Sequence, residues 1–420
     1  MSVGRVRSLA PSELVFAMAG AYIGYRLRVR GELDIPALSV AFAGLRRRYP
    51  VLSAVLEPED RGYAIVAGPG PLPGIVVSAG DIDAPIPGVC GDQSRALSGL
   101  HVAHDGDRAA VTLFTHHSVA DGYHSLELLA DLWSLYTAAV SGEAVDLIPR
   151  DYPESLEQVL ADRGIVKADN PIAEAPSAAT AAAEPSGPPA RVSDAMRMYT
   201  IAAARVRLDA ETTSGLLARA RKYETTLNGV VSAVILRVEA EMNGVAGERL
   251  AYTYAVDLRN RIAPPVPKPA ATNPLGFASF VPAGDLGGTA SVARAVTEEL
   301  RKGLENGEIH QAGLRFFDTM TTAVAQFALV PESQRPVIVI SSNWGVVPTP
   351  RVPGLEFEDF SSVMFEPRTD PDAPVAPPGT YVLSTFGDRL SIELRSPFPL
   401  EAARQRIAAI ESGLRALDGA

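Results

Sequence analysis

The chain has 420 residues, of which 47% are hydrophobic and 21% are charged, a balance typical of a globular protein rather than a disordered one. This length predicts two domains of about 200 residues each. The net charge of −11 argues against sequence-independent nucleic-acid binding, which needs Lys and Arg to neutralise phosphates. Cys90 is the only cysteine, so an intramolecular disulfide is excluded.

The amino-terminal segment is not typical of a secretory signal, because residues 1–7 are followed by a short apolar run that contains the charged Glu13. No stretch approaches 18 uncharged apolar residues, so no membrane span is predicted. We therefore expect a cytoplasmic protein without a membrane span, and we expect it to be a monomer.

The first 150 residues predict a mixed α/β arrangement. Residues 27–30 alternate between apolar and basic side chains, as expected for a strand with one wet face. Asp34 is a suitable N-cap for a helix with Pro36 in its first turn, which should end near Arg48, before Pro50. Further strands are expected at 51–57, 63–66 and 109–115, a turn-rich loop at 69–74, and a helix at 125–140.

The composition shifts to Ala, Pro, Ser and Glu between residues 169 and 191, which predicts a linker or a surface crossover. It separates an N-terminal half (1–168) from a C-terminal half (192–420). In the second half, Asp209 or Thr212 could cap one helix, and Thr226 precedes a long apolar helical stretch. The expected strands are 200–208, 250–256, 337–340, 381–386 and 390–394, and the last helix is 400–417.

The most informative segment is His116-His117-Ser118-Val119-Ala120-Asp121-Gly122. With His124, it places three of the six histidines within nine positions, together with a carboxylate and a glycine. The segment lies where the buried strand ends and the next helix begins, a position from which side chains can project into a cleft. A neutral imidazole in such a place could act as a general base.

Acyl transfer from a thioester to a hydroxyl matches what one such histidine can do. The hydroxyl must lose its proton as it attacks, the oxyanion must meet hydrogen-bond donors, and both substrates must be held in register. One histidine can take the proton without forming a covalent intermediate, provided that its tautomer and orientation are fixed. Gly122 has no Cβ and so allows close approach of a substrate to the backbone.

The residues alone leave three other interpretations open. A metal site could use His116, His117, Asp121 and His124, although adjacent histidines do not easily share one ion. A Ser-His-Asp triad would need a nucleophile, and no Gly-x-Ser-x-Gly motif is present. The histidines could also form a purely structural cluster.

The motif His-His-x-x-x-Asp-Gly resembles the signature of the condensation-domain and chloramphenicol-acetyltransferase-like superfamily. Within it, the chain resembles the polyketide-associated acyltransferases of the phthiocerol/phthiodiolone dimycocerosyl transferase type over nearly its whole length. The Asp-Phe-Gly-Trp-Gly motif of related plant-type acyltransferases is absent. The further segments that carry the resemblance are Arg48-Tyr49-Pro50-Val51-Leu52, Val256-Asp257-Leu258-Arg259, Ala263-Pro264-Pro265-Val266, Thr272-Asn273-Pro274-Leu275-Gly276 and Ser342-Asn343-Trp344-Gly345.

This resemblance implies a fold and a role for each residue of the motif. It implies an α/β fold of two acetyltransferase-like halves, each a mixed sheet with helices, around a central channel. His117 would be the general base, while Asp121 would face away from substrate and pair with Arg259. His116 and Gly122 would support the site. Weaker assignments place Asn343 and His124 along the substrate-lining surface.

The implied activity is O-acyl transfer without a covalent enzyme intermediate. The donor would be a thioester of coenzyme A or of an acyl carrier protein, and the acceptor a hydroxyl of a polyketide-derived or lipid molecule. No metal or cofactor is expected, because the pantetheine thioester is itself a substrate. An amide-forming condensation enzyme and a non-catalytic carrier-docking module remain as alternatives.

Overall fold

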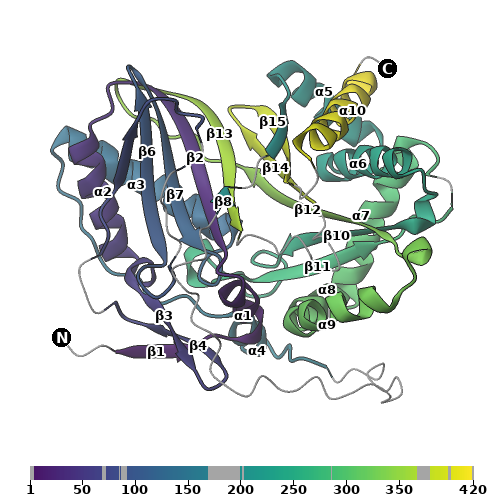
Figure 1. The fold of residues 1–420 in the computed structure, drawn as a ribbon, viewed down its shortest axis with the longest axis horizontal. Helices are drawn as coiled ribbons and strands as arrows, with labels where there is room; N and C mark the ends of the chain where they lie inside the picture. The colour runs from purple at the N-terminus through teal and green to yellow at the C-terminus, as the bar shows by residue number, and fades with distance from the viewer. Residues whose placement is uncertain are drawn as a thin grey trace.

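The computed structural model describes residues 4–68, 72–84, 86, 92–168, 199–200, 203–284, 286–366, 379–395 and 399–418. Cys90 and the predicted linker at 169–191 lie outside these ranges. Two six-stranded sheets stand side by side, each with its helices on the side away from the other, and a three-stranded sheet lies below the first (Figure 1). The fold is therefore α/β with two sheet-and-helix halves, as the sequence predicts.

The N-terminal half is built around a mixed sheet. Its strands are, in spatial order, β5 (Val76–Ala79), β6 (Ser98–Asp105), β7 (Arg108–His116), β2 (Tyr22–Gly31), β13 (Leu355–Glu366) and β8 (Tyr199–Thr200). Helices α2 (Ile35–Arg48) and α3 (Gly122–Ser141) cover one face, where Tyr25, Leu27 and Val29 of β2 belong to the apolar core. Because side chains alternate along a strand, Arg26 and Arg28 point to the opposite face.

The C-terminal half repeats this plan with a second mixed sheet. Its strands are, in spatial order, β11 (Leu275–Phe280), β10 (Leu250–Asp257), β12 (Val337–Val346), β14 (Thr380–Phe386), β15 (Arg389–Arg395) and β9 (Ala203–Arg207). Its helices are α5 (Ala210–Lys222), α6 (Leu227–Asn243), α7 (Thr289–Glu305), α8 (Glu308–Leu314), α9 (Phe316–Leu329) and α10 (Leu400–Asp418).

Segments from late in the chain complete the N-terminal half. Strand β13 comes from late in the chain but pairs antiparallel with β2 along ten positions, and so completes the N-terminal sheet. Trp344 and Phe386, from β12 and β14, also belong to the apolar cluster of the N-terminal half. The division of the chain at 169–191 stays a prediction, but segments on both sides of it build the first sheet.

The remaining elements lie at the base of the N-terminal half. The small sheet has the order β1 (Arg5–Ser8), β4 (Gly62–Val66), β3 (Val55–Glu59). Helix α1 (Pro11–Met18) contacts α8 and α9 of the other half, as α4 (Leu156–Ala161) contacts α8. Helix α1 thus lies at the junction of the two halves.

Local capping signals were read correctly from the sequence. Asp34 Oδ1 accepts a hydrogen bond from Ala37 N at 2.8 Å, and Thr226 caps α6 in the same way. For α5, the cap is Asp209, because its carboxylate accepts from the main-chain N–H of Thr212. The predicted strand at 51–57 is only half right, since residues Pro50–Ser53 form a 3-10 turn that begins at the proline.

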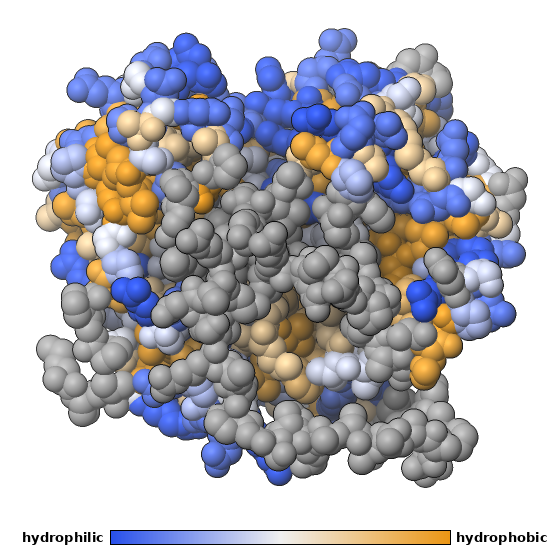
Figure 2. Space-filling view, in the orientation of Figure 1, coloured by the Kyte–Doolittle hydropathy of each residue, from blue (hydrophilic) through white to orange (hydrophobic). Residues whose placement is uncertain are grey.

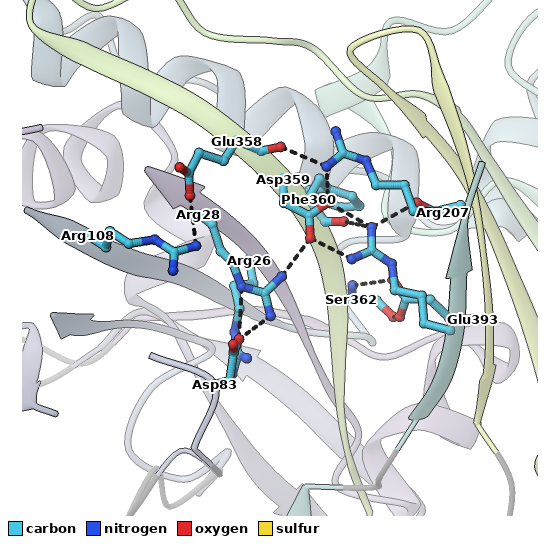
Figure 3. A network of polar contacts seen from close by, with 12 residues as sticks. Arg26, Arg28, Asp83, Arg108, Arg207, Glu358, Asp359, Phe360, Ser362 and Glu393 are labelled. Atoms are coloured by element: carbon cyan, nitrogen blue, oxygen red, sulfur yellow. Dashed lines mark hydrogen bonds and ion pairs between the residues drawn. The ribbon is translucent and has the colours of Figure 1, made fainter. Parts of the chain in front are cut away.

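A network of ion pairs joins the two sheets on the faces where the halves meet (Figure 3). Asp359 of β13 accepts hydrogen bonds from Arg28 of β2 at 2.6 Å and from Arg205 of β9 at 2.6 and 2.9 Å. Arg207 of β9 lies 3.2 Å from the same carboxylate. Burial alone would raise the pKa of Asp359, but these three cations lower it. One carboxylate therefore ties the edge strand of the C-terminal sheet to the N-terminal sheet.

Figure 2 shows mainly hydrophilic side chains over the upper ends of both halves in the view of Figure 1. No helix in the described ranges is both long enough and apolar enough to cross a membrane.

Candidate active site

His117 lies directly after β7, in the turn that leads into α3, where both halves and helix α1 meet. Its main-chain N–H donates to the carbonyl of Ala21 at 2.8 Å. The ring of Phe16 from α1 stacks on the imidazole, with a centroid separation of 3.9 Å and an interplanar angle of 3°. The residue as a whole is partly exposed.

The surroundings of His117 favour the neutral imidazole. Burial is the largest influence and lowers its pKa, while hydrogen bonds to its own main-chain carbonyl and to Asn273 offset part of that shift. With a pKa below the ordinary value of 6.5, the ring is unprotonated near pH 7 and can accept a proton.

The sequence did not single out Asn273, although this residue contacts the candidate base directly. Its Nδ2 donates to the main-chain carbonyl of His117 at 2.7 Å. Its Oδ1 lies 3.1 Å from Nδ1 of the same histidine. The sequence signal for it is its place in the segment 272–276, which carries part of the family resemblance.

The structure brings Asp121 and Arg259 together, as the resemblance implied. Arg259 Nη1 and Nη2 donate to the two carboxylate oxygens at 2.7 and 3.0 Å, and both side chains are 1% exposed. Asp121 is also the N-cap of α3, because Oδ1 accepts from His124 N at 2.9 Å. These three bonds hold the buried carboxylate against Arg259 and the first turn of α3.

His116 and His124 are both fully buried. His116 Nδ1 accepts from Ser118 N at 3.2 Å, and burial lowers the pKa of His116 to about 3, so its ring is neutral and supports the turn. Burial likewise lowers the pKa of His124 to about 4. A ring without exposed surface cannot meet substrate in this structure. We therefore correct the assignment of His124 from the substrate-lining surface to the buried support around Asp121 and Arg259.

The missing Cβ of Gly122 allows close packing against a side chain of the C-terminal half rather than leaving open space for substrate. A Cβ at this position would lie 3.1 Å from the indole of Trp344, which packs over it from β12. Beside Trp344, Asn343 is half-buried; its Oδ1 accepts from Gly345 N and its Nδ2 donates to Asn228 at 3.1 Å. A substrate-lining role for Asn343 stays a prediction.

The surface next to His117 includes a small cavity with aromatic walls. It is lined by Ser12, Phe16, Asn273, Leu275, Phe277, Gly313 and Phe316. Phe316 of α9 contacts both Phe16 and Phe277, so an aromatic row runs from the imidazole into the C-terminal half. Among the residues that the structure describes, no three His, Cys, Asp or Glu side chains gather as metal ligands would.

Comparisons with known proteins agree with this architecture. Residues 198–395 match the family described as the phthiocerol/phthiodiolone dimycocerosyl transferase C-terminus. The phthiocerol/phthiodiolone dimycocerosyl transferase of Mycobacterium bovis is 35% identical over 86% of each chain, and that of a further Mycobacterium species is 32% identical over 99% of this chain and 98% of that protein.

Solved structures extend the likeness to the fold. Polyketide synthase associated protein 5 from Mycobacterium tuberculosis is 31% identical, with a TM-score of 0.79 over 99% of this chain and 98% of that one. A trichothecene 15-O-acetyltransferase from Fusarium sporotrichioides, 11% identical, has a TM-score of 0.65 over 98% and 95% and shows the shared fold alone. The chain belongs to the phthiocerol/phthiodiolone dimycocerosyl transferase family and is an acyltransferase.

Proposed function

We propose that this acyltransferase moves an acyl group from a thioester to a hydroxyl, with His117 as the general base. The observation that carries the proposal is the combination of a partly exposed, neutral imidazole with a carboxylate that is fully engaged elsewhere. Asp121 is held by Arg259 and caps the first turn of α3, so among the described residues no carboxylate is hydrogen-bonded to the His117 ring, as a Ser-His-Asp triad would need. The imidazole acts directly on the acceptor.

The reaction then proceeds in two steps. As the acceptor oxygen forms its bond to the thioester carbon, His117 Nε2 takes the hydroxyl proton, and a tetrahedral oxyanion forms. When that intermediate collapses, the carbon–sulfur bond breaks and the imidazolium returns the proton to the leaving sulfur. The products are an ester and a thiol, and His117 is neutral again. No atom changes its oxidation state, so the bonds and protons balance without a cofactor.

The donor in this proposal is a thioester of coenzyme A or of an acyl carrier protein, and the acceptor is a hydroxyl of a polyketide-derived or lipid molecule. The support is the 32–35% identity to proteins named as dimycocerosyl transferases, extending over nearly the whole chain. The aromatic row from Phe16 to Phe277 offers an apolar surface beside the base, as an acyl chain requires.

The test is intact-mass detection of acyl transfer with a panel of acyl thioesters, each offered with alcohol and amine acceptors. His117→Ala should lower turnover by at least about a hundredfold, the scale of a lost general base, with an unchanged circular dichroism spectrum. Unchanged thioester consumption by this variant would overturn the catalytic role and leave a carrier-docking module. Transfer to amines but not to alcohols would instead identify an amide-forming enzyme.

A further inference from the structure

The side-chain amide of Asn273 contacts both the main-chain carbonyl and the ring of His117. Asn273 Nδ2 donates to the main-chain carbonyl of His117 at 2.7 Å, which fixes the orientation of the amide, since the flipped amide would set two acceptors against each other. Oδ1 therefore faces Nδ1 of the imidazole at 3.1 Å. A carbonyl oxygen can only accept, so Nδ1 must donate, and the neutral ring then has its lone pair on Nε2.

Asn273 is itself held firmly by its neighbour Thr272. The Thr272 carbonyl accepts from Asp121 N at 3.0 Å, and its N–H donates to the carbonyl of Glu154 at 2.9 Å. Thr272 Oγ1 donates to Glu13 Oε1 at 2.7 Å, and Glu13, which is fully buried, pairs with Arg7 through two bonds of 2.7 Å. Three separate segments thus anchor the residue that precedes Asn273.

These contacts connect the candidate base to two ion pairs, of which one is fully buried and the other partly buried. The pair of Asp121 and Arg259 holds the loop after His117, and the pair of Arg7 and Glu13 holds helix α1. Helix α1 also supplies Phe16, whose stacking fixes the plane of the imidazole. Stacking leaves the tautomer open, because either nitrogen can carry the proton in the same plane. The Asn273 amide supplies such a constraint together with the main-chain carbonyl of His117, which also accepts from the ring and which Asn273 Nδ2 holds in place.

We propose that Asn273 is a positioning residue that holds His117 as the Nδ1–H tautomer, so that Nε2 is always free to take the proton of the acceptor hydroxyl. The inference rests on the proposed function of His117 as the base. It adds a residue 156 positions away in the sequence, which acts through the imidazole and helps to decide, with the main-chain carbonyl of His117, which ring nitrogen can react. The requirement is strict, because a ring with its proton on Nε2 cannot accept another there.

The first experiment measures the tautomer directly, without activity. In protein labelled with ¹⁵N at its six histidines, the His117 signals are assigned as those missing from the His117→Ala spectrum. In the unmodified protein above pH 7, Nδ1 should show the shift of a protonated nitrogen and Nε2 that of an unprotonated one. Asn273→Ala should move both shifts towards averaged values. Unchanged shifts in that variant would overturn the proposal.

The second experiment separates positioning from a merely structural role through the pH dependence of kcat/KM. Asn273→Asp keeps an acceptor opposite Nδ1, loses the donor to the His117 carbonyl, and adds a negative charge, which stabilises the imidazolium. The acidic limb of the profile should move upward by about one unit or more, and activity should recover at higher pH. Asn273→Ala should lower kcat by about ten- to a hundredfold, with little change in KM.

A control variant and a second test variant make the outcome of these experiments unambiguous. Asn243→Ala removes an amide of the same type at the far end of α6, where it bonds only Glu239, and should leave the pH profile unchanged. If Asn273→Ala does not fold, Asn273→Asp still carries the test, and an unshifted acidic limb in that variant would refute the proposal. Full activity in His117→Ala would refute the proposed function instead, whatever the tautomer.

Discussion

Removing the charge of Asp121 should destabilise the protein, although this carboxylate takes no part in proton transfer in the mechanism that we propose. Asp121→Asn preserves an oxygen to cap His124 N but leaves the guanidinium of Arg259 without its main counter-charge at 1% exposure. Breaking a buried pair from one side costs about 3–5 kcal/mol. Arg259 keeps Asp257 at 2.9 Å, so we expect the lower end of that range, about 3 kcal/mol.

The matching change, Arg259→Met, leaves Asp121 as the buried charge and should cost about 4 kcal/mol. The double variant leaves neither partner charged, so its loss should be smaller than the sum of the two single losses, with a coupling of about 2–3 kcal/mol. Urea unfolding followed by tryptophan fluorescence measures this, because Trp133 and Trp344 both belong to the core cluster beside Asp121.

Additive effects of the two substitutions would refute this reasoning, because they would mean that the charges do not depend on each other. An unchanged midpoint in either single variant would refute it as well. The control is Arg301→Gln on α7, which removes an exposed ion pair with Glu298 and should leave the midpoint unchanged.

Two further predictions concern the junction of the halves and the buried histidines. Asp359→Asn should lower the free energy of unfolding by about 3 kcal/mol, because three arginines lose a shared carboxylate that is 13% exposed. Asp83→Asn, which changes the exposed partner of Arg28, should alter the free energy of unfolding little. Equal unfolding midpoints for the two variants would contradict this prediction. For the histidines, folded pKa values of about 3 for His116 and about 4 for His124 lie below the unfolded value near 6.5, so the unfolded state binds protons first. The contribution of these two histidines to the free energy of unfolding is therefore fully present above pH 6.5. It should fall by about 1.4 kcal/mol per pH unit and per histidine down to about pH 4. Unfolding midpoints measured between pH 7 and 5 test this. His116→Asn, which keeps an acceptor for Ser118 N, should remove one histidine's share of the slope of stability against pH. An unchanged slope in this variant would contradict the prediction.

Elements with a strong local signal were predictable. Helix α2 begins at an Asp N-cap and ends before Pro50, and α6 begins at Thr226, so local hydrogen bonds and apolar spacing agree with the final structure. Strand β2 was predicted at only four of its ten residues, because its remaining side chains are also buried and do not alternate in polarity. Strand β13 and helices α1, α8 and α9 are not predicted, since their positions depend on contacts between the halves. Helix α7 is not predicted either, although it packs within the C-terminal half against α6, α8 and β11.

The sequence by itself determined the class of the fold and the family, because the motif and its flanking strand and helix are contiguous, and it singled out His117 as the candidate base. The resemblance also identified Arg259 as the partner of Asp121. Only the tertiary structure decided how His117 is oriented, since Phe16 and Asn273 reach it from 101 residues before and 156 residues after in the chain. It also decided that His124 is buried and that Gly122 faces Trp344. Burial, tautomer and contact across the two halves are properties of packing between distant segments, which no local pattern of residues encodes.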